Sequence, residues 1–497
     1  MEVVGEALGI LLDPQHLLLL IVAVVAGLTV GAIPGMTSTM AIGLLVPLTF
    51  ATTKYAAFIL LLGIYCGAIY GGSIPAILMN LPGTPTAAIT AIDGYPMTKK
   101  GKGGLAIGIA TLSSTLGGLI SCFFLIFLSL PLANIAILFG PPEYFALGAF
   151  ALAVVMALSG RSVLKGLLST ALGVLLATTG IDMIVQSPRF TFGITELLIG
   201  IPAVPAIIGL FCVSEALRMA EDLPIEATVQ KTAGGLRMAS RLLPRLWLTI
   251  VKSSLIGTFI GTLPGIGALM ASYLSYAEAK RVSKTPEQFG KGAPEGVCAS
   301  EAANNAVTGG ALVPMLALGI PGDTSTLMIL GAMIVHGLQP GPTLFREETV
   351  LVYVIFGAMV LANLLILPLG LSLARHIAKC ALIDRKYLMP TVAVLAITGA
   401  SIGYGHIYYF WISIFFGLLG YLLRKANFPL LPIAMALILE PLIESNFRSS
   451  MMMPDVGVLF FLSRPITLFF LVMGILVIWF GIRRERRLVD DETIPSA

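Results

Sequence analysis

Long apolar runs separated by short polar segments fill most of this chain. Several runs reach the roughly 20 residues that a helix needs to span about 30 Å of hydrocarbon. Examples lie at 104–130, 350–372 and 465–482. This pattern predicts an all-α protein that crosses a membrane several times.

Composition supports the same class. Of the 497 residues, 57% are hydrophobic and only 11% are charged, and the mean hydropathy is +0.96. A soluble core does not need so much apolar sequence, whereas a membrane protein embedded in a lipid bilayer does. The net charge of +4 is concentrated in loops, so we expect no nucleic-acid partner.

Cysteine and histidine add no metal or redox chemistry. The five cysteines are odd in number and mostly lie in apolar runs, which is typical of small core residues. The four histidines are isolated, so no metal-site spacing is present. We expect no cofactor, with Na⁺ as a candidate coupling ion. Glu2, Glu6 and Asp13 stand where a signal peptide would be basic, so no cleaved signal peptide is expected.

A Pro-Gly motif inside an apolar run occurs twice. Residues 31–43 read GAIPGMTSTMAIG and residues 261–273 read GTLPGIGALMASY, so that Pro264 follows Pro34 by 230 residues. A second pair follows each copy. YGGSIPAILMNLPGTPT (70–86) resembles TGGALVPMLALGIPGDTST (308–326), with an offset of 239 residues. Two motifs in one order at nearly one offset indicate a duplication.

Loop charges indicate that the two halves face opposite ways. The lysines of 98–103 correspond to the acidic loop 346–348, and the basic turn 161–165 corresponds to the uncharged 403–409. Under the positive-inside rule, such loops lie on opposite membrane faces. The N-terminus is then outside and the C-terminus inside. The predicted organisation is a periplasmic N-terminus (1–16), a first transmembrane repeat (17–217), a cytoplasmic linker (218–245), a second inverted repeat (246–463), a final transmembrane helix (464–482) and a cytoplasmic tail (483–497).

The number of spans stays open at two places. Runs 17–50 and 253–279 each enter and leave on one side. They fit either two short spans or a re-entrant hairpin that reverses at the Pro-Gly pair.

The four Pro-Gly breaks are the first candidate site. Irregular backbone inside a membrane is tolerated only within protein or beside a water-filled cavity, so paired breaks predict broken helices that meet near the midplane. Proline has no N–H to satisfy, and glycine adopts positive φ. Free N–H groups at helix starts, with nearby hydroxyls, suit an anion, while freed carbonyls and a carboxylate suit Na⁺ or a proton. The alternative is a set of ordinary kinks whose Ser and Thr bond back to their own helices.

A polar stretch, APEGVCASEAANNAVTGG at 293–310, is the second candidate. Residues three and four apart share one helix face, and an acid with two amides in an apolar setting favours substrate or cation binding. A hydrogen-bonded seam between helices is the alternative. The substrate-binding candidates are Pro34, Gly35, Thr37, Ser38, Thr39, Pro82, Gly83, Thr84, Thr86, Pro264, Gly265, Gly267, Asn304, Asn305, Pro321, Gly322, Thr324, Ser325 and Thr326, and the ion-binding candidates are Glu301, Thr308 and Asp323.

Three further acids are interpreted structurally. Asp93, in AIDGYP, is expected at a helix end or turn. Glu215 and Glu444 align across the halves and are expected to form structural pairs.

At these motifs the sequence resembles a known family. IPGMTSTMAIGLLVPLTF (33–50), the segment from Ile64 to Gly104, and residues 293–331 together resemble the large, TctA-like membrane subunit of the tripartite tricarboxylate transporters. The resemblance covers essentially the whole chain. It implies an ion-transporter-superfamily fold with inverted repeats, paired re-entrant hairpins and elevator-type movement.

The resemblance also implies a function. The expected activity is import of organic anions, citrate or other di- and tricarboxylates, in symport with Na⁺ or H⁺ across the bacterial inner membrane. The expected partners are a small membrane subunit with four helices and a periplasmic solute-binding protein. Because none of the four breaks contains Lys or Arg, a carboxylate would depend on N–H groups and hydroxyls.

Two other classes of membrane protein are alternatives to a transporter. An intramembrane enzyme is disfavoured, since the sequence has no HExxH motif and Asp323 lacks the GxGD context. The absence of a GxxxxGK[ST] loop argues against ATP as the direct energy source. An anion channel remains the third alternative, although a simple pore does not need two inverted halves.

Overall fold

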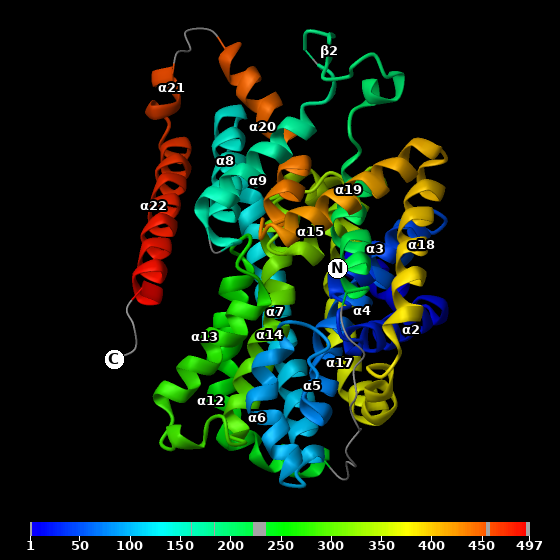
Figure 1. The fold of residues 1–497 in the computed structure, drawn as a ribbon, viewed down its shortest axis with the longest axis vertical. Coiled ribbons are helices and arrows are strands. Elements are labelled where there is room, and N and C mark those ends of the chain that lie inside the picture. Colours follow the sequence, from blue (N-terminus) through cyan, green and yellow to red (C-terminus); the bar gives the residue numbers. More distant parts are fainter. Residues whose placement is uncertain (1, 161, 183, 222–234, 454–457, 494–497) are drawn as a thin grey trace. The chain divides into compact units, whose positions relative to one another are not determined.

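A computed structural model describes residues 2–160, 162–182, 184–221, 235–453 and 458–493 (Figure 1). Seven of its helices are long and apolar enough to cross a membrane. The apolar runs at 104–130, 350–372 and 465–482 lie within three of them, α7 (Gly103–Ala136), α17 (Thr349–Cys380) and α22 (Pro465–Thr493). The prediction of an all-α polytopic membrane protein is confirmed. Arg161 of the basic turn, 222–234 of the predicted linker and 494–497 of the predicted tail lie outside the described residues.

The chain divides into two compact units. Unit one consists of 1–134 and 215–399, and unit two of 135–214 and 400–497. Each unit therefore draws one segment from each predicted repeat. The inversion of those repeats stays a prediction.

Unit one is helical. Besides most of α7 and all of α17, it contains α1 (Glu2–Leu12), α2 (Pro14–Ala32), α3 (Ser38–Thr49), α4 (Lys54–Gly71), α5 (Ser73–Met79), α6 (Ala87–Lys99), α11 (Ser214–Met219), α12 (Gly235–Gly261), α13 (Gly267–Val282), η3 (Pro286–Gln288), α14 (Pro294–Leu318), α15 (Thr324–Val335), α16 (Pro342–Glu347) and most of α18 (Arg385–Tyr404).

Unit two is helical apart from one short hairpin. Besides α22, it contains α8 (Pro141–Leu158), α9 (Val163–Ala177), β1 (Gly180–Ile181), β2 (Pro188–Arg189), η1 (Thr195–Ile199), α10 (Ala203–Ile208), η2 (Gly209–Val213), α19 (Ile407–Lys425), α20 (Leu431–Met451) and α21 (Val458–Ser463). The two strands pair antiparallel.

An ion-pair cluster ties this hairpin to α20. Asp182 accepts hydrogen bonds from the N–H groups of Ile184 and Val185, both at 2.8 Å, and from Arg448. The Val185 N–H, then the Ile184 N–H and Arg448, lower the pKa of Asp182 to about 2. A lowered pKa stabilises the fold above the ordinary carboxyl pKa, and this stabilisation disappears as pH falls through about 2.

Both acids predicted to form structural pairs do so. Glu444 pairs with Arg189 and with Arg448, each at 2.6 Å. Glu215 pairs with Arg218 at 2.9 Å.

In unit one, two helix pairs pack backbone against backbone through glycine. A methyl group added to Gly27 of α2 would lie 2.5 Å from the carbonyl oxygen of Ile64 in α4. A methyl group added to Gly257 of α12 would lie 2.3 Å from the carbonyl oxygen of Ala303 in α14. Both distances are too short for any side chain. Since Gly257 follows Gly27 by 230 residues and Ala303 follows Ile64 by 239, the two contacts recur at the offsets of the sequence motifs. Small residues permit this approach between membrane helices.

The four breaks separate helices as predicted, but their glycines serve two different purposes. Gly35 lies between α2 and α3 with φ 93°, and Gly265 lies between α12 and α13 with φ 85°, so both need the left-handed region. Gly83 and Gly322 do not have positive φ, and for them the expected reason is wrong. A methyl group on either would lie 2.1 Å from a carbonyl oxygen, that of Gly31 or Gly261, so these positions need the absence of a side chain.

The close packing predicts a sharp contrast between two glycine substitutions. Gly257→Ala should destabilise the protein by about 1–3 kcal/mol, because backbone atoms cannot move aside as a side chain can. Gly9→Ala, in α1 with no atom within 4 Å of the added methyl, should be neutral or stabilise by up to about 1 kcal/mol, because alanine favours helix. Thermal unfolding in detergent measures both. Equal midpoints for the two variants would refute the packing argument.

Candidate functional site

Hydroxyl groups from the first and fourth breaks meet directly. The Ser38 and Ser325 Oγ atoms lie 2.7 Å apart, and the Thr39 and Thr324 Oγ1 atoms 2.6 Å apart. Thr39 Oγ1 also lies 3.2 Å from Ser325 Oγ. These four residues, hereafter the hydroxyl cluster, place the first turns of α3 and α15 side by side. Residues more than 280 positions apart in sequence thus form one polar group.

Both helices start with a side-chain cap. Thr37 accepts a hydrogen bond from Met40 N at 3.2 Å, and Asp323 accepts one from Thr326 N at 2.7 Å. In return, the Thr326 hydroxyl accepts from Asp323 N at 3.0 Å, which completes a capping box. Capping leaves the N–H groups of Ser38, Thr39 and Thr324 without an acceptor in the described part of the chain. Two adjacent helix N-termini with free N–H groups favour an anion.

The remaining breaks adjoin these two. Gly265 N donates to the Gly322 carbonyl oxygen at 3.2 Å, so the third and fourth breaks touch. Gly83 packs against the Gly31 carbonyl at the end of α2, next to the first break. Thr84 and Thr86 bond each other at 3.0 Å and do not bond the hydroxyl cluster. Gly267, with φ 73°, starts α13 and has open space beside it.

The four prolines do not extend outward from the breaks. Pro34, Pro264 and Pro321 are buried, and Pro82 is half-buried. The breaks therefore form a connected inner region of unit one, as their pairing in the sequence predicts.

Asp323 has a partner that the sequence did not reveal. Tyr65, fully buried in α4, donates its hydroxyl to Asp323 Oδ2 at 2.8 Å, while Oδ1 accepts from the N–H and the hydroxyl of Thr326. A tyrosine in an apolar run is a weak signal, because most such residues are core.

Glu301 occupies a second polar centre. It lies fully buried in α14 and accepts hydrogen bonds from Ser73 of α5 at 2.5 Å, from Ser114 of α7 at 2.8 Å, and from Thr90 of α6. Within the described residues no Lys, Arg or His pairs with it. A carboxylate held only by hydroxyls is suited to exchange a proton or a cation. Sequence reasoning identified the acid but missed its three hydroxyl partners.

The two asparagines leave acceptors free. Asn304 Nδ2 donates to the Ile69 carbonyl oxygen at 3.3 Å and Asn305 Nδ2 to that of Glu301 at 3.5 Å. Their Oδ1 atoms are buried with no partner in the described part of the chain. The Thr308 hydroxyl bonds the Asn305 carbonyl of its own helix at 2.7 Å, which is the behaviour that the kink alternative predicts. No group of three or more His, Cys, Asp or Glu suited to a metal ion occurs among the described residues.

Asp93 corrects another expectation. It lies inside α6, not at a helix end or turn. One carboxylate oxygen accepts from the N–H groups of Gly290, Gly292 and Ala293 at 2.7–2.9 Å, and the other accepts from the Tyr276 hydroxyl at 2.9 Å. The carboxylate therefore fastens α6 to the segment that leads into α14.

Fold and site together define a multi-pass helical membrane protein whose helices break at a buried polar centre. Comparison of sequences identifies it further. A profile of the Tripartite tricarboxylate transporter TctA family matches residues 17–435, and the chain belongs to that family. The family is one of transporters, and its members belong to tripartite systems.

Two relatives come from Agrobacterium vitis. The chain is 36% identical over 487 residues, 97% of each sequence, to an uncharacterized 52.8 kDa protein in the TAR-I ttuC' 3' region. It is 31% identical over 242 residues to an uncharacterized protein in the TAR-II ttuC' 3' region, covering 48% of this chain and 100% of the relative. No solved structure matches.

The hydroxyl cluster predicts a disulfide between engineered cysteines. In a background without native cysteine, Ser38→Cys with Ser325→Cys should oxidise readily, because an Oγ–Oγ distance of 2.7 Å brings the two Cβ atoms near the separation of a disulfide. Thr37→Cys with Ser325→Cys is the matched control and should stay reduced, since Thr37 turns back onto Met40. Protection from maleimide labelling in denaturant, reversed by dithiothreitol, measures both. Labelling of the first pair to completion after oxidation would contradict the contact.

Proposed function

We propose that this chain is the large membrane subunit of a secondary importer of di- and tricarboxylates, driven by a Na⁺ or H⁺ gradient. The observation that carries the proposal is the meeting of two helix N-termini at the hydroxyl cluster. Three free N–H groups, with the hydroxyl hydrogens that the cluster does not use in its own hydrogen bonds, supply donors for a carboxylate without a permanent positive charge. The candidates Pro34, Pro264, Pro321 and the glycines beside them would shape this site through their backbone.

Electrostatics supports coupling to a cation. Asp323 borders the hydroxyl cluster, and Glu301 and the free amide oxygens lie in the neighbouring α14. No Lys or Arg belongs to the four breaks. A carboxylate substrate beside these acids would be repelled unless a cation entered with it, because like charges in a low-dielectric site are costly. We therefore assign Asp323, Glu301 and Thr308 to the coupling ion. Asn304 and Asn305 were expected to bind substrate, but the atoms that they leave free are Oδ1 acceptors, which suit the cation better than a carboxylate.

The proposed location of the protein and its proposed partners rest on loop charge and on family membership. The excess of Lys and Arg in the loops assigned to the inside supports a bacterial inner-membrane protein with its N-terminus outside and its C-terminus inside. Membership in a tripartite family supports delivery of substrate by a periplasmic binding protein and assembly with a small four-helix membrane subunit.

Uptake by the assembled transporter tests the proposal. Vesicles containing this chain and its partners should accumulate a labelled di- or tricarboxylate only when an inward Na⁺ or H⁺ gradient is imposed. A panel of carboxylates, each assayed with and without Na⁺, identifies substrate and ion together. Uptake that ionophores leave unchanged would exclude gradient coupling and favour a channel.

Two substitutions at Asp323 separate binding from helix capping. Asp323→Asn keeps a good N-cap but removes the charge, so it should lower uptake at least tenfold with little change in the unfolding midpoint. Asp323→Ala also removes the cap and should cost about 1 kcal/mol of stability in addition. Normal uptake in Asp323→Asn would remove this residue from the ion site.

A further inference from the structure

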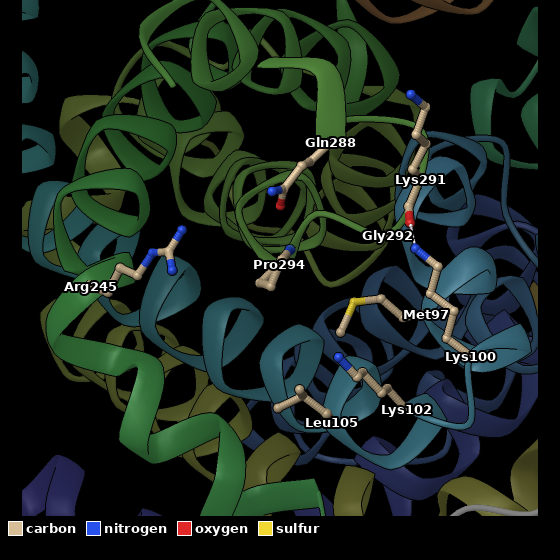
Figure 2. A pocket seen from close by; sticks show the side chains of 9 residues that line it. All are labelled: Met97, Lys100, Lys102, Leu105, Arg245, Gln288, Lys291, Gly292 and Pro294. Carbon is tan, nitrogen blue, oxygen red and sulfur yellow. Dashed lines mark hydrogen bonds between the residues drawn. The ribbon is translucent and has the colours of Figure 1, made fainter. Parts of the chain in front are cut away.

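A cavity of about 500 Å³ lies in unit one, formed by residues other than those of the hydroxyl cluster (Figure 2). Three segments surround it: the end of α6 with the start of α7, the middle of α12, and the segment that precedes α14. Its lining residues are Met97, Lys100, Lys102, Leu105, Arg245, Gln288, Lys291, Gly292 and Pro294. The volume is in the range of small-ligand sites.

Polar side chains from each segment point into this space. Figure 2 shows Lys102, Arg245 and Gln288 directed toward its centre, whereas the Lys291 side chain extends away from it. The Lys100 ammonium group is held at the rim, where it donates to the Lys291 carbonyl oxygen at 2.6 Å. The cavity thus presents two cations and one amide from separate elements.

Nearby acids cancel only part of this charge. Arg245 pairs with Glu295 at 2.7 Å, and the Asp93 carboxylate is already bound by three N–H groups and one hydroxyl. Lys102 has no ion-pair partner in the described part of the chain. Four basic side chains therefore border the cavity, whereas only two carboxylates lie nearby: Glu295, which is paired with Arg245, and Asp93, which is enclosed by its own donors. The net charge around the cavity is positive.

We propose that this cavity is a second anion site, which binds a multivalent oxyanion through Lys102, Arg245 and Gln288. Charge-assisted N–H···O bonds from convergent Lys and Arg are the usual means of holding phosphate and carboxylate groups. The lysine loop 98–103 and the segment 280–291 are assigned to the cytoplasmic face by their charge. The oxyanion is therefore either a free cytoplasmic anion or the phosphate of an anionic phospholipid headgroup, which basic residues at that face also attract.

Direct binding tests this site without reference to transport, so its outcome is independent of the proposed function. The full chain is placed in phosphatidylcholine nanodiscs, and the binding of inorganic phosphate is measured for wild type, Lys102→Gln and Lys291→Gln. In a parallel arm, phosphatidylglycerol replaces part of the lipid, and lipid retained through delipidation is counted by native mass spectrometry. Gel filtration of each variant checks that it is folded.

Lys291→Gln is the matched control, because it removes the same charge from the same rim but from a side chain that points away. Lys102→Gln should weaken binding about tenfold, as expected for the loss of one charged hydrogen bond, and Lys291→Gln by less than about twofold. If the two variants differ in this way in the binding of inorganic phosphate, the ligand is a free anion. If they differ only in the retention of phosphatidylglycerol, the ligand is a lipid headgroup. Equal effects of the two variants in both arms, or no binding in either, would overturn the proposal.

Discussion

Contact between bare helix backbones is the constraint on which the architecture of unit one depends. Gly83 and Gly322 lie so close to the carbonyls that end α2 and α12 that no side chain fits there. These contacts place the second and fourth breaks against the ends of the helices that precede the first and third. The hydroxyl cluster then joins the two sets of breaks, because α3 starts from the first break and α15 from the fourth. Glycine packing within each set and polar contacts between them together hold the breaks in one region.

Much of this arrangement could be predicted from local sequence. Apolar run length predicted the membrane helices, and the Pro-Gly pairs predicted where helices end, since proline lacks an N–H and the adjacent glycine favours a change of backbone direction. The conformation of Gly35 and Gly265 also followed from residue type. The reason for glycine at Gly83 and Gly322 could not be predicted from residue type. These positions cannot hold a side chain because a second helix packs against them, and local sequence does not reveal that helix.

Side-chain partners were the least predictable part. Tyr65 reaches Asp323 across 258 residues of sequence, and the hydroxyls around Glu301 come from three other helices. Such pairs are determined by tertiary packing, and the local periodicity of a sequence gives no information about them. The sequence did predict the polar face of α14, because three- and four-residue spacing is local. It misplaced Asp93, whose neighbouring proline and glycine suggested a turn although the helix continues through them.

The anchoring of α6 has a mechanical consequence. Asp93 holds the segment before α14 by three hydrogen bonds and accepts a fourth from Tyr276 of α13. About one turn away on α6, Thr90 bonds both Ser300 and Glu301 of α14 itself. Separating the two helices would remove hydrogen-bond donors from two buried carboxylates at once. We therefore expect α6 and α14 to move together in any conformational change, with hinges in other parts of the unit.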